Sequence, residues 1–115
     1  MCGIAGWIAG GSLPPDRAIL SRMANAMAHR GPDAEGVLVV GEAGLVHRRL
    51  SVVDLSTTNN QPMRDTTGRF SLVFNGEIYN FQELRRELEG RGVVFHTHGD
   101  TEVLLEAVKA WGPAA

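Results

Sequence analysis

The 115-residue sequence predicts a single α+β domain with a mixed or antiparallel β-sheet. Segments with the two-residue period of strands alternate with segments whose apolar residues recur at helical spacing. Two strand-like segments, residues 35–40 and 45–53, are joined only by the tight turn 41–44. Such a turn favours an antiparallel pair over a doubly wound parallel sheet. A chain of this length normally forms one hydrophobic core.

The first half of the chain is predicted to contain a strand, a helix and the hairpin described above. Residues 2–8 are short and apolar and are followed by Gly10 and Gly11, as expected for a buried strand. A helix then opens near Pro14 and stops before Gly31. Its apolar face carries Leu20, Met23 and Met27.

The second half is predicted to contain a loop, two strands and two helices. Residues 54–68 are polar and lack periodicity, whereas residues 70–75 alternate as in a strand. A helix follows, with Asn80 and Glu83 as a capping box, and ends at Gly90. Residues 93–97 read as another strand. A last helix, capped by Asp100 or Thr101, carries the apolar stripe Leu104, Val108 and Trp111 and stops at Gly112.

Composition excludes several classes of function. The net charge of -2, the pI near 6.0 and the scattered basic residues predict no nucleic-acid partner. The apolar segment 4–9 is far shorter than the roughly 20 residues that a membrane-spanning helix needs, so we expect no membrane association. A single cysteine forms no internal disulfide and, with four histidines, no structural zinc site. A cytoplasmic location is therefore expected.

Cys2 is the residue with the most chemical potential. Removal of Met1, which a small second residue permits, would leave a thiol and a free α-amine on one residue. An α-amine titrates close to neutral pH, so it can take the thiol proton directly or through water. Taken alone, however, a single cysteine is more often a small buried hydrophobic residue than a nucleophile.

Five motifs distinguish between these two interpretations of Cys2. They are CGIAG at 2–6, HRGPD at 29–33, HRRLS at 47–51, FNGEIYN at 74–80 and GDTEV at 99–103. Their order and approximate spacing resemble the asparagine synthetase branch of the class II glutamine amidotransferases, which are N-terminal nucleophile hydrolases. The resemblance extends through the whole chain, and FNGEIYN is its most specific motif.

The resemblance implies both a fold and a reaction. The family domain is a four-layer αββα sandwich with mostly antiparallel sheets. Its cysteine, Cys2 here, attacks the side-chain amide of L-glutamine, releases ammonia and leaves a glutamyl thioester that water hydrolyses. Asn75 and Gly76 then correspond to the oxyanion hole, which needs a side-chain amide and an unhindered backbone N–H. Without the resemblance, Asn75-Gly76 reads as a turn dipeptide.

The resemblance also implies how the α-carboxylate of glutamine is held. Arg49 matches the family arginine that clamps this group, a role suited to a planar and permanently charged fork. Its neighbour Arg48 is the competing residue. Because strand neighbours point to opposite faces, we expect one of the two arginines to be solvated surface. Leu50, Val52 and Val53 match positions whose backbone contacts the substrate.

Glu77 and Asp100 match the acidic residues that receive the α-ammonium of glutamine. One cationic and two anionic contacts then complement a zwitterion. From the sequence alone, Asp100 is equally well explained as the cap of a helix. His96 and His98 have no further ligands at recognisable spacing, so no metal is predicted. His29 and Arg30 suit the C-terminal end of a helix.

The family domain is considerably longer than this chain, so we expect residues 1–115 to be a partial amidotransferase domain, inactive by itself. The resemblance implies no cofactor in this segment. ATP and Mg²⁺ are expected only for the synthetase domain, which would accept the ammonia and which these residues do not contain. A homodimer of the full-length enzyme is also expected. Alternatives are a non-catalytic binding module or the glutaminase half of an enzyme that amidates a peptide or a surface sugar.

Two local departures from the family pattern are visible. Asn59-Asn60 precede Gln61-Pro62 where small residues or histidine are commoner, and Gly99 stands where serine often precedes the aspartate. Neither departure removes a predicted catalytic group. A retained Met1 would matter more, because it acylates the amine that should act as the base.

Overall fold

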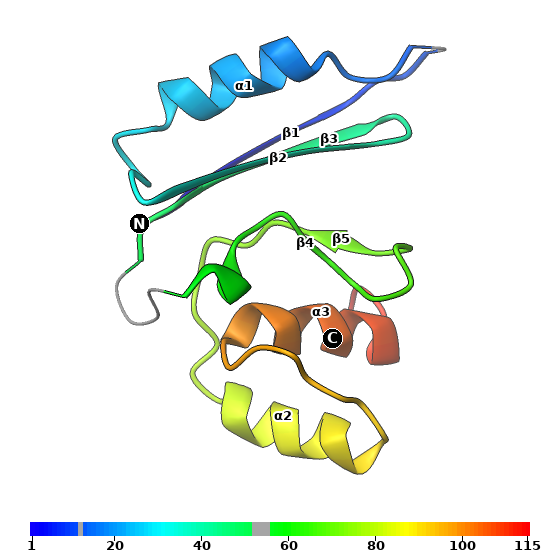
Figure 1. Ribbon diagram of the computed structural model, residues 1–115. Helices are drawn as coiled ribbons and strands as arrows, with labels where there is room; N and C mark the ends of the chain where they lie inside the picture. The colour runs from blue at the N-terminus through cyan, green and yellow to red at the C-terminus, as the bar shows by residue number, and fades with distance from the viewer. Residues whose placement is uncertain (12, 52–55) are drawn as a thin grey trace.

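The structure is a computed structural model that describes residues 1–11, 13–51 and 56–115. The described residues form three α-helices, one 3-10 helix and five strands in two antiparallel sheets, which confirms the predicted α+β class. Helix α1 covers the outer face of the larger sheet, and the smaller sheet and helices α3 and α2 follow on its other side (Figure 1). No helix within the described residues is both long and apolar enough to cross a membrane.

The larger sheet contains β1 (Gly3–Ile8), β2 (Ala34–Val40) and β3 (Ala43–Arg49), in the order β1-β3-β2. The predicted hairpin is confirmed, with a turn in which Gly41 has a φ of 56°, a conformation that favours glycine. The predicted second strand of this hairpin ends earlier than expected, at Arg49. Because β1 and β3 are antiparallel, the first residues of β1 lie beside the last residues of β3.

Helix α1 (Arg17–Ala26) packs on this sheet through its predicted apolar face. The Asp16 side chain accepts a hydrogen bond from the backbone N of Ala18 at 2.8 Å and so caps the helix. Leu20 and Ala24 are fully buried against Val46, at 0% exposure for each of the three. The apolar face of α1 and the inner residues of β3 thus form the first hydrophobic cluster.

The rest of the chain forms a second cluster, so the prediction of a single core is wrong for the described residues. Helices α2 (Phe81–Gly90) and α3 (Asp100–Trp111) bury Leu88 between Val103 and Ala107. The predicted stripe on α3 is therefore displaced, since Leu104 and Val108 are only half-buried. Trp111 packs against this cluster from its edge.

The polar segment predicted as a loop contains two short elements. They are the 3-10 helix η1 (Thr57–Asn59) and strand β4 (Met63–Arg64), which pairs with β5 (Ser71–Leu72). The predicted strand 70–75 is thus reduced to two residues. The predicted capping box at α2 is also wrong, because Asn80 is the N-cap but its side chain makes no cap hydrogen bond.

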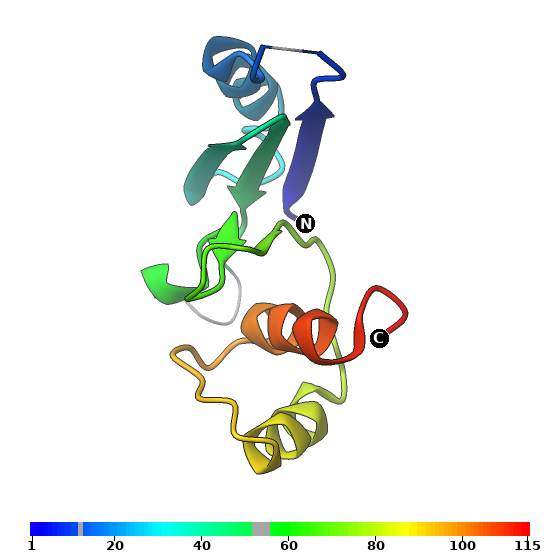
Figure 2. The same cartoon turned by 90° about the vertical axis from the view of Figure 1, so that its right-hand side faces the viewer.

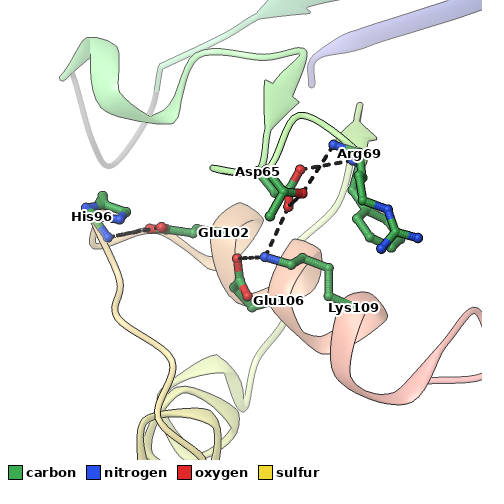
Figure 3. Close-up of polar contacts among 8 residues, drawn as sticks. Asp65, Arg69, His96, Glu102, Glu106 and Lys109 are labelled. Carbon is green, nitrogen blue, oxygen red and sulfur yellow. Dashed lines mark hydrogen bonds and ion pairs between the residues drawn. The ribbon is translucent and has the colours of Figure 1, made fainter.

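The predicted strand 93–97 is absent, because the carboxylate of Glu102 takes the backbone groups that a neighbouring strand would otherwise satisfy. It accepts hydrogen bonds from the backbone N of His96 at 3.0 Å and of Thr97 at 2.7 Å, and one from the Thr97 hydroxyl at 2.7 Å. Figure 3 shows Glu102 reaching from α3 to His96. A buried carboxylate thereby holds this segment on α3 without a sheet.

A second acidic residue, Asp65, fixes the β4–β5 turn on α3 (Figure 3). Its carboxylate accepts hydrogen bonds from the Thr67 hydroxyl at 2.6 Å and the backbone N of Phe70 at 3.0 Å. It also forms an ion pair with Lys109 at 3.2 Å. These contacts, the Thr67 hydroxyl foremost, hold the pKa of Asp65 well below its usual value. The Lys109 pKa is raised, mainly by its hydrogen bond to Glu106.

Candidate active site

Cys2 lies immediately before β1, at the end of the larger sheet that is opposite the β2–β3 turn. Its Sγ accepts a hydrogen bond from the backbone N of Leu50 at 3.4 Å and lies 3.9 Å from the Leu50 carbonyl oxygen. Its own carbonyl accepts a hydrogen bond from Nε of Arg30 at 3.2 Å. The Cys2 side chain is half-buried, whereas Met1 is 78% exposed. The antiparallel β1–β3 pairing thus places the only thiol against the residue that follows Arg49.

Arg49 is the last residue of β3 and is only 9% exposed. Its Nη1 donates to the carbonyl oxygen of Ser56 at 2.5 Å and to Oδ1 of Asn60 at 2.9 Å. Arg48, on the opposite face, donates from Nε to the Gly31 carbonyl at 2.9 Å and pairs with Glu35 at 2.7 Å. The expectation that one arginine is merely solvated surface is therefore wrong, because both arginines hold neighbouring segments in place.

The FNGEIYN motif leaves β5 and runs toward α2 as an irregular segment. Asn75 is half-buried, whereas Gly76 and Glu77 are exposed. A Cβ atom on Gly76 would lie 2.9 Å from Cζ of Phe74, so a side chain here would force the aromatic ring to move. The absence of a side chain thus allows Phe74 to fold back over Gly76.

Asp100 joins this segment to α3. Its Oδ2 accepts a hydrogen bond from the backbone N of Ile78 at 2.9 Å. The N-cap of α3 is Gly99, so the prediction that Asp100 or Thr101 caps the helix is wrong. The carboxylate of Asp100 instead reaches across to the residue after Glu77, and so brings the two predicted ammonium-binding residues into one region.

Two predicted substrate contacts, Val52 and Val53, lie outside the described residues. Leu50 is described and half-buried, with its backbone on Cys2 as above. Within the described residues no group of three or more His, Cys, Asp or Glu side chains could hold a metal ion. The described residues predicted for the site therefore offer one thiol, one arginine, two carboxylates, the Asn75 amide and backbone N–H groups.

Residues 60 and 61 connect these groups, and the sequence assigned no role to either. Asn60 accepts from Arg49, while Gln61 accepts from the backbone N of Phe74 at 2.5 Å and donates to the Thr101 hydroxyl at 3.3 Å. Both views place the start of β1 at the level where the chain leaves β5 for α2 (Figures 1 and 2). The only sequence feature that could have indicated this role is the run of amide side chains at 59–61.

His47 lies beneath this region, in the middle of the β1-β3-β2 sheet. It is 1% exposed, and among the described residues its Nε2 has no hydrogen-bond partner. Burial lowers its pKa, the backbone of Phe74 opposes this shift and the positive charge of Arg49 adds to it. The imidazole is therefore neutral near pH 7, and it contributes packing rather than charge below the site.

Comparison with known proteins identifies the class to which this arrangement belongs. The family described as the glutamine amidotransferase domain matches residues 1–115. The chain belongs to this family. The family therefore confirms the resemblance drawn from the five motifs.

The names of similar proteins support the same assignment. The glutamine-hydrolyzing asparagine synthetase 1 of Bacillus subtilis is 42% identical over 87 residues, covering 76% of this chain and 14% of that protein. The corresponding synthetase 3 of B. subtilis is 38% identical over 96% of this chain and 18% of its own length. A putative glutamine-hydrolyzing asparagine synthetase of Mycobacterium tuberculosis is 40% identical over 97% of this amidotransferase chain and 20% of its own length. The chain thus spans a fifth or less of these three relatives.

Proposed function

We propose that residues 1–115 form part of the glutaminase domain of a glutamine-hydrolysing asparagine synthetase. In this proposal Cys2, freed from Met1, releases ammonia from L-glutamine through a glutamyl thioester. The observation that carries the proposal is the contact between Cys2 Sγ and the Leu50 backbone, directly after the buried Arg49. The names of the three relatives supply the substrate class and the acceptor reaction.

The proposed chemistry begins with the thiol of Cys2. After removal of Met1, the free α-amine of Cys2 takes the proton of the Cys2 thiol. The sulfur then attacks the side-chain carbonyl carbon of glutamine. The Leu50 N–H, 3.4 Å from Sγ, points a positive dipole at the developing thiolate. The carbon–nitrogen bond then breaks, ammonia leaves with the transferred proton, and water hydrolyses the thioester to glutamate. The high exposure of Met1 is compatible with its removal.

Both tetrahedral intermediates carry an oxyanion, for which Asn75 and Gly76 are the proposed donors. Arg49 is proposed to bind the α-carboxylate, since its guanidinium is oriented by Ser56 and Asn60 before substrate arrives. Asp100 and Glu77 are proposed to bind the α-ammonium, because the Ile78–Asp100 hydrogen bond keeps them in one region. Pre-oriented charges of both signs suit an amino acid substrate.

The complete fold, the acceptor of the ammonia and the cellular location are also proposed. We propose that the layers in Figure 1 belong to a four-layer αββα sandwich of the N-terminal nucleophile type. Support comes from α1 on one side of the larger sheet and from a second sheet with α2 and α3 on the other. We further propose that activated aspartate accepts the ammonia in a synthetase domain, where ATP and Mg²⁺ act, and that the enzyme works in the cytoplasm.

Covalent labelling tests the proposal directly. The complete gene product is incubated with a glutamine-derived diazoketone, and intact mass and peptide mass spectrometry locate the adduct. We expect one adduct on Cys2, protection by excess L-glutamine and no adduct in Cys2→Ala. Absence of labelling on protein shown to lack Met1 would refute the proposal.

The same mass measurement tests the alternative of a non-catalytic binding module. A mature protein that keeps Met1 has an acylated amine on Cys2, so the proposed base is lost. Retention of Met1 on protein isolated from its native cells would therefore favour the binding module. Glutaminase activity with Met1 removed would exclude it.

A further inference from the structure

The backbone of Phe74 is held by a side chain where the β-ladder stops. Strands β4 and β5 pair Met63 with Leu72 and Arg64 with Ser71. Extension of this antiparallel register by two residues would place Gln61 opposite Phe74. The Gln61 carbonyl oxygen, which this register would turn toward the Phe74 N–H, lies instead against Gly36 of β2. The Gln61 side chain takes over instead, and its Oε1 accepts the Phe74 N–H at 2.5 Å.

The second half of the same amide reaches helix α3. Because Oε1 must accept from a backbone N–H, Nε2 is the donor, and it lies 3.3 Å from the Thr101 hydroxyl oxygen. Thr101 is 5% exposed and directly follows Asp100. One side chain thus joins the residue before Asn75-Gly76 to the residue after Asp100.

The backbone that carries Gln61 is held as tightly as its side chain. The Gln61 carbonyl oxygen occupies the space where a Cβ on Gly36 would stand, 1.8 Å from that position. On the preceding residue, Asn60 Oδ1 accepts from Arg49 at 2.9 Å. Strand β2 and Arg49 at the end of β3 therefore set the position of Gln61. A shift of Gln61 would disturb its contact with Gly36 and the hydrogen bond between Asn60 and Arg49.

We propose that Gln61 is a positioning residue that sets the Asn75-Gly76 segment relative to Asp100 and Arg49. This inference rests on the proposed function, in which those residues hold the oxyanion and the two charged groups of glutamine. Gln61 touches neither the substrate nor Cys2 in this role. It acts through the Phe74 amide, so its loss leaves the reacting groups present but misplaced, and a displacement of about 1 Å can lower a rate by roughly 100-fold.

Gln61→Met in the complete gene product tests the inference, since methionine has a similar length but makes neither hydrogen bond. Gln82→Met is the matched control, because Gln82 is exposed on α2. We expect kcat for glutamine hydrolysis to fall about 10- to 100-fold in Gln61→Met, with a smaller rise in KM. We also expect the amides of residues 74–76 to exchange hydrogen about 2- to 10-fold faster, from loss of one hydrogen bond. The control should match the wild type in both measurements.

Thr101→Val provides a second variant if Gln61→Met does not fold, since it removes only the contact with Nε2. It should also lower kcat more than it raises KM, and Thr101→Ser should restore the wild-type value. Unchanged kcat, KM and amide exchange in a folded variant would overturn the role of Gln61 while the proposed function stands. Failure of wild-type Cys2 to react with the diazoketone would instead refute the proposed function, and amide exchange would still report whether Gln61 holds Phe74.

Discussion

Gly36→Ala perturbs a close backbone contact between the larger sheet and the segment that carries Gln61. The new Cβ would lie 1.8 Å from the Gln61 carbonyl oxygen and 2.7 Å from both the Gln61 carbonyl carbon and Pro62 Cδ. A Cβ atom essentially never lies closer than 3.0 Å to a heavy atom of a residue other than its own or its two chain neighbours. Strand β2 and the 61–62 backbone must therefore separate by more than 1 Å, and no flexible side-chain end can absorb the shift.

The magnitude follows from the cost of overpacking, which is typically about 1–3 kcal/mol. We expect the upper end of this range, because the obstructing atoms belong to backbone and to a proline ring. A loss of about 3 kcal/mol raises the population of the open sheet, and with it the rate of hydrogen exchange, by roughly 100-fold. Hydrogen exchange of peptides from β2 and β3 measures this opening within the complete gene product.

Gly10→Ala is the matched control, since a Cβ on Gly10 would meet no atom of the described residues within 4 Å. Its exchange rates should stay at the wild-type values. Equal exchange in Gly36→Ala and wild type would refute the reasoning, because the chain could then accept a methyl group where the structure leaves no room. Exchange that rises equally in both variants would show a general effect of alanine rather than the contact with Gln61.

Three further predictions concern single side chains. Asn75→Ala should cost about 2.7–4 kcal/mol of transition-state stabilisation, measured as a fall in kcat with little change in KM, and a rise in KM alone would contradict the oxyanion role. Asp65→Asn should remove a pH-dependent part of stability: the folded pKa is depressed, so this part is present above pH about 4 and is lost as the pH falls further. Urea midpoints of wild type and variant should therefore converge below pH about 4, and a constant difference would exclude this origin. Glu102→Gln should destabilise by about 1–3 kcal/mol, because it replaces a buried acceptor of three hydrogen bonds, and unchanged amide exchange at 96–97 would disprove it.

Local patterns predicted the elements that form within short stretches of sequence. The helix before Gly31 and the hairpin around Gly41 follow from apolar spacing and turn residues, and both are present. The strand predicted at 93–97 is absent, because the backbone N–H groups of His96 and Thr97 donate to Glu102 rather than to a neighbouring strand. A periodicity reports which face is buried, but it does not report which partner takes the backbone hydrogen bonds.

For the candidate site, too, some residues were predicted from sequence motifs and others were recognised only from the structure. Motif order alone selected Cys2, Arg49 and Asp100, since each residue type suits a distinct part of glutamine. No sequence pattern indicated a role for Gln61, because its partners Phe74 and Thr101 are 13 and 40 residues away. The structural role of Arg48 was not predicted either, because its hydrogen bond to the Gly31 carbonyl depends on how the segment after α1 folds back.

The sequence by itself determined the α+β class and the family, and it supplied the residues proposed to carry the chemistry, because composition, periodicity and motif order can be read along the chain. Only the tertiary structure decided how those residues are held together. Antiparallel pairing of β1 and β3 brings Cys2 to Leu50, and the amide of Gln61 joins Phe74 to Thr101 beyond the end of the β4–β5 ladder. These contacts depend on register and close packing between distant segments, which no local pattern encodes.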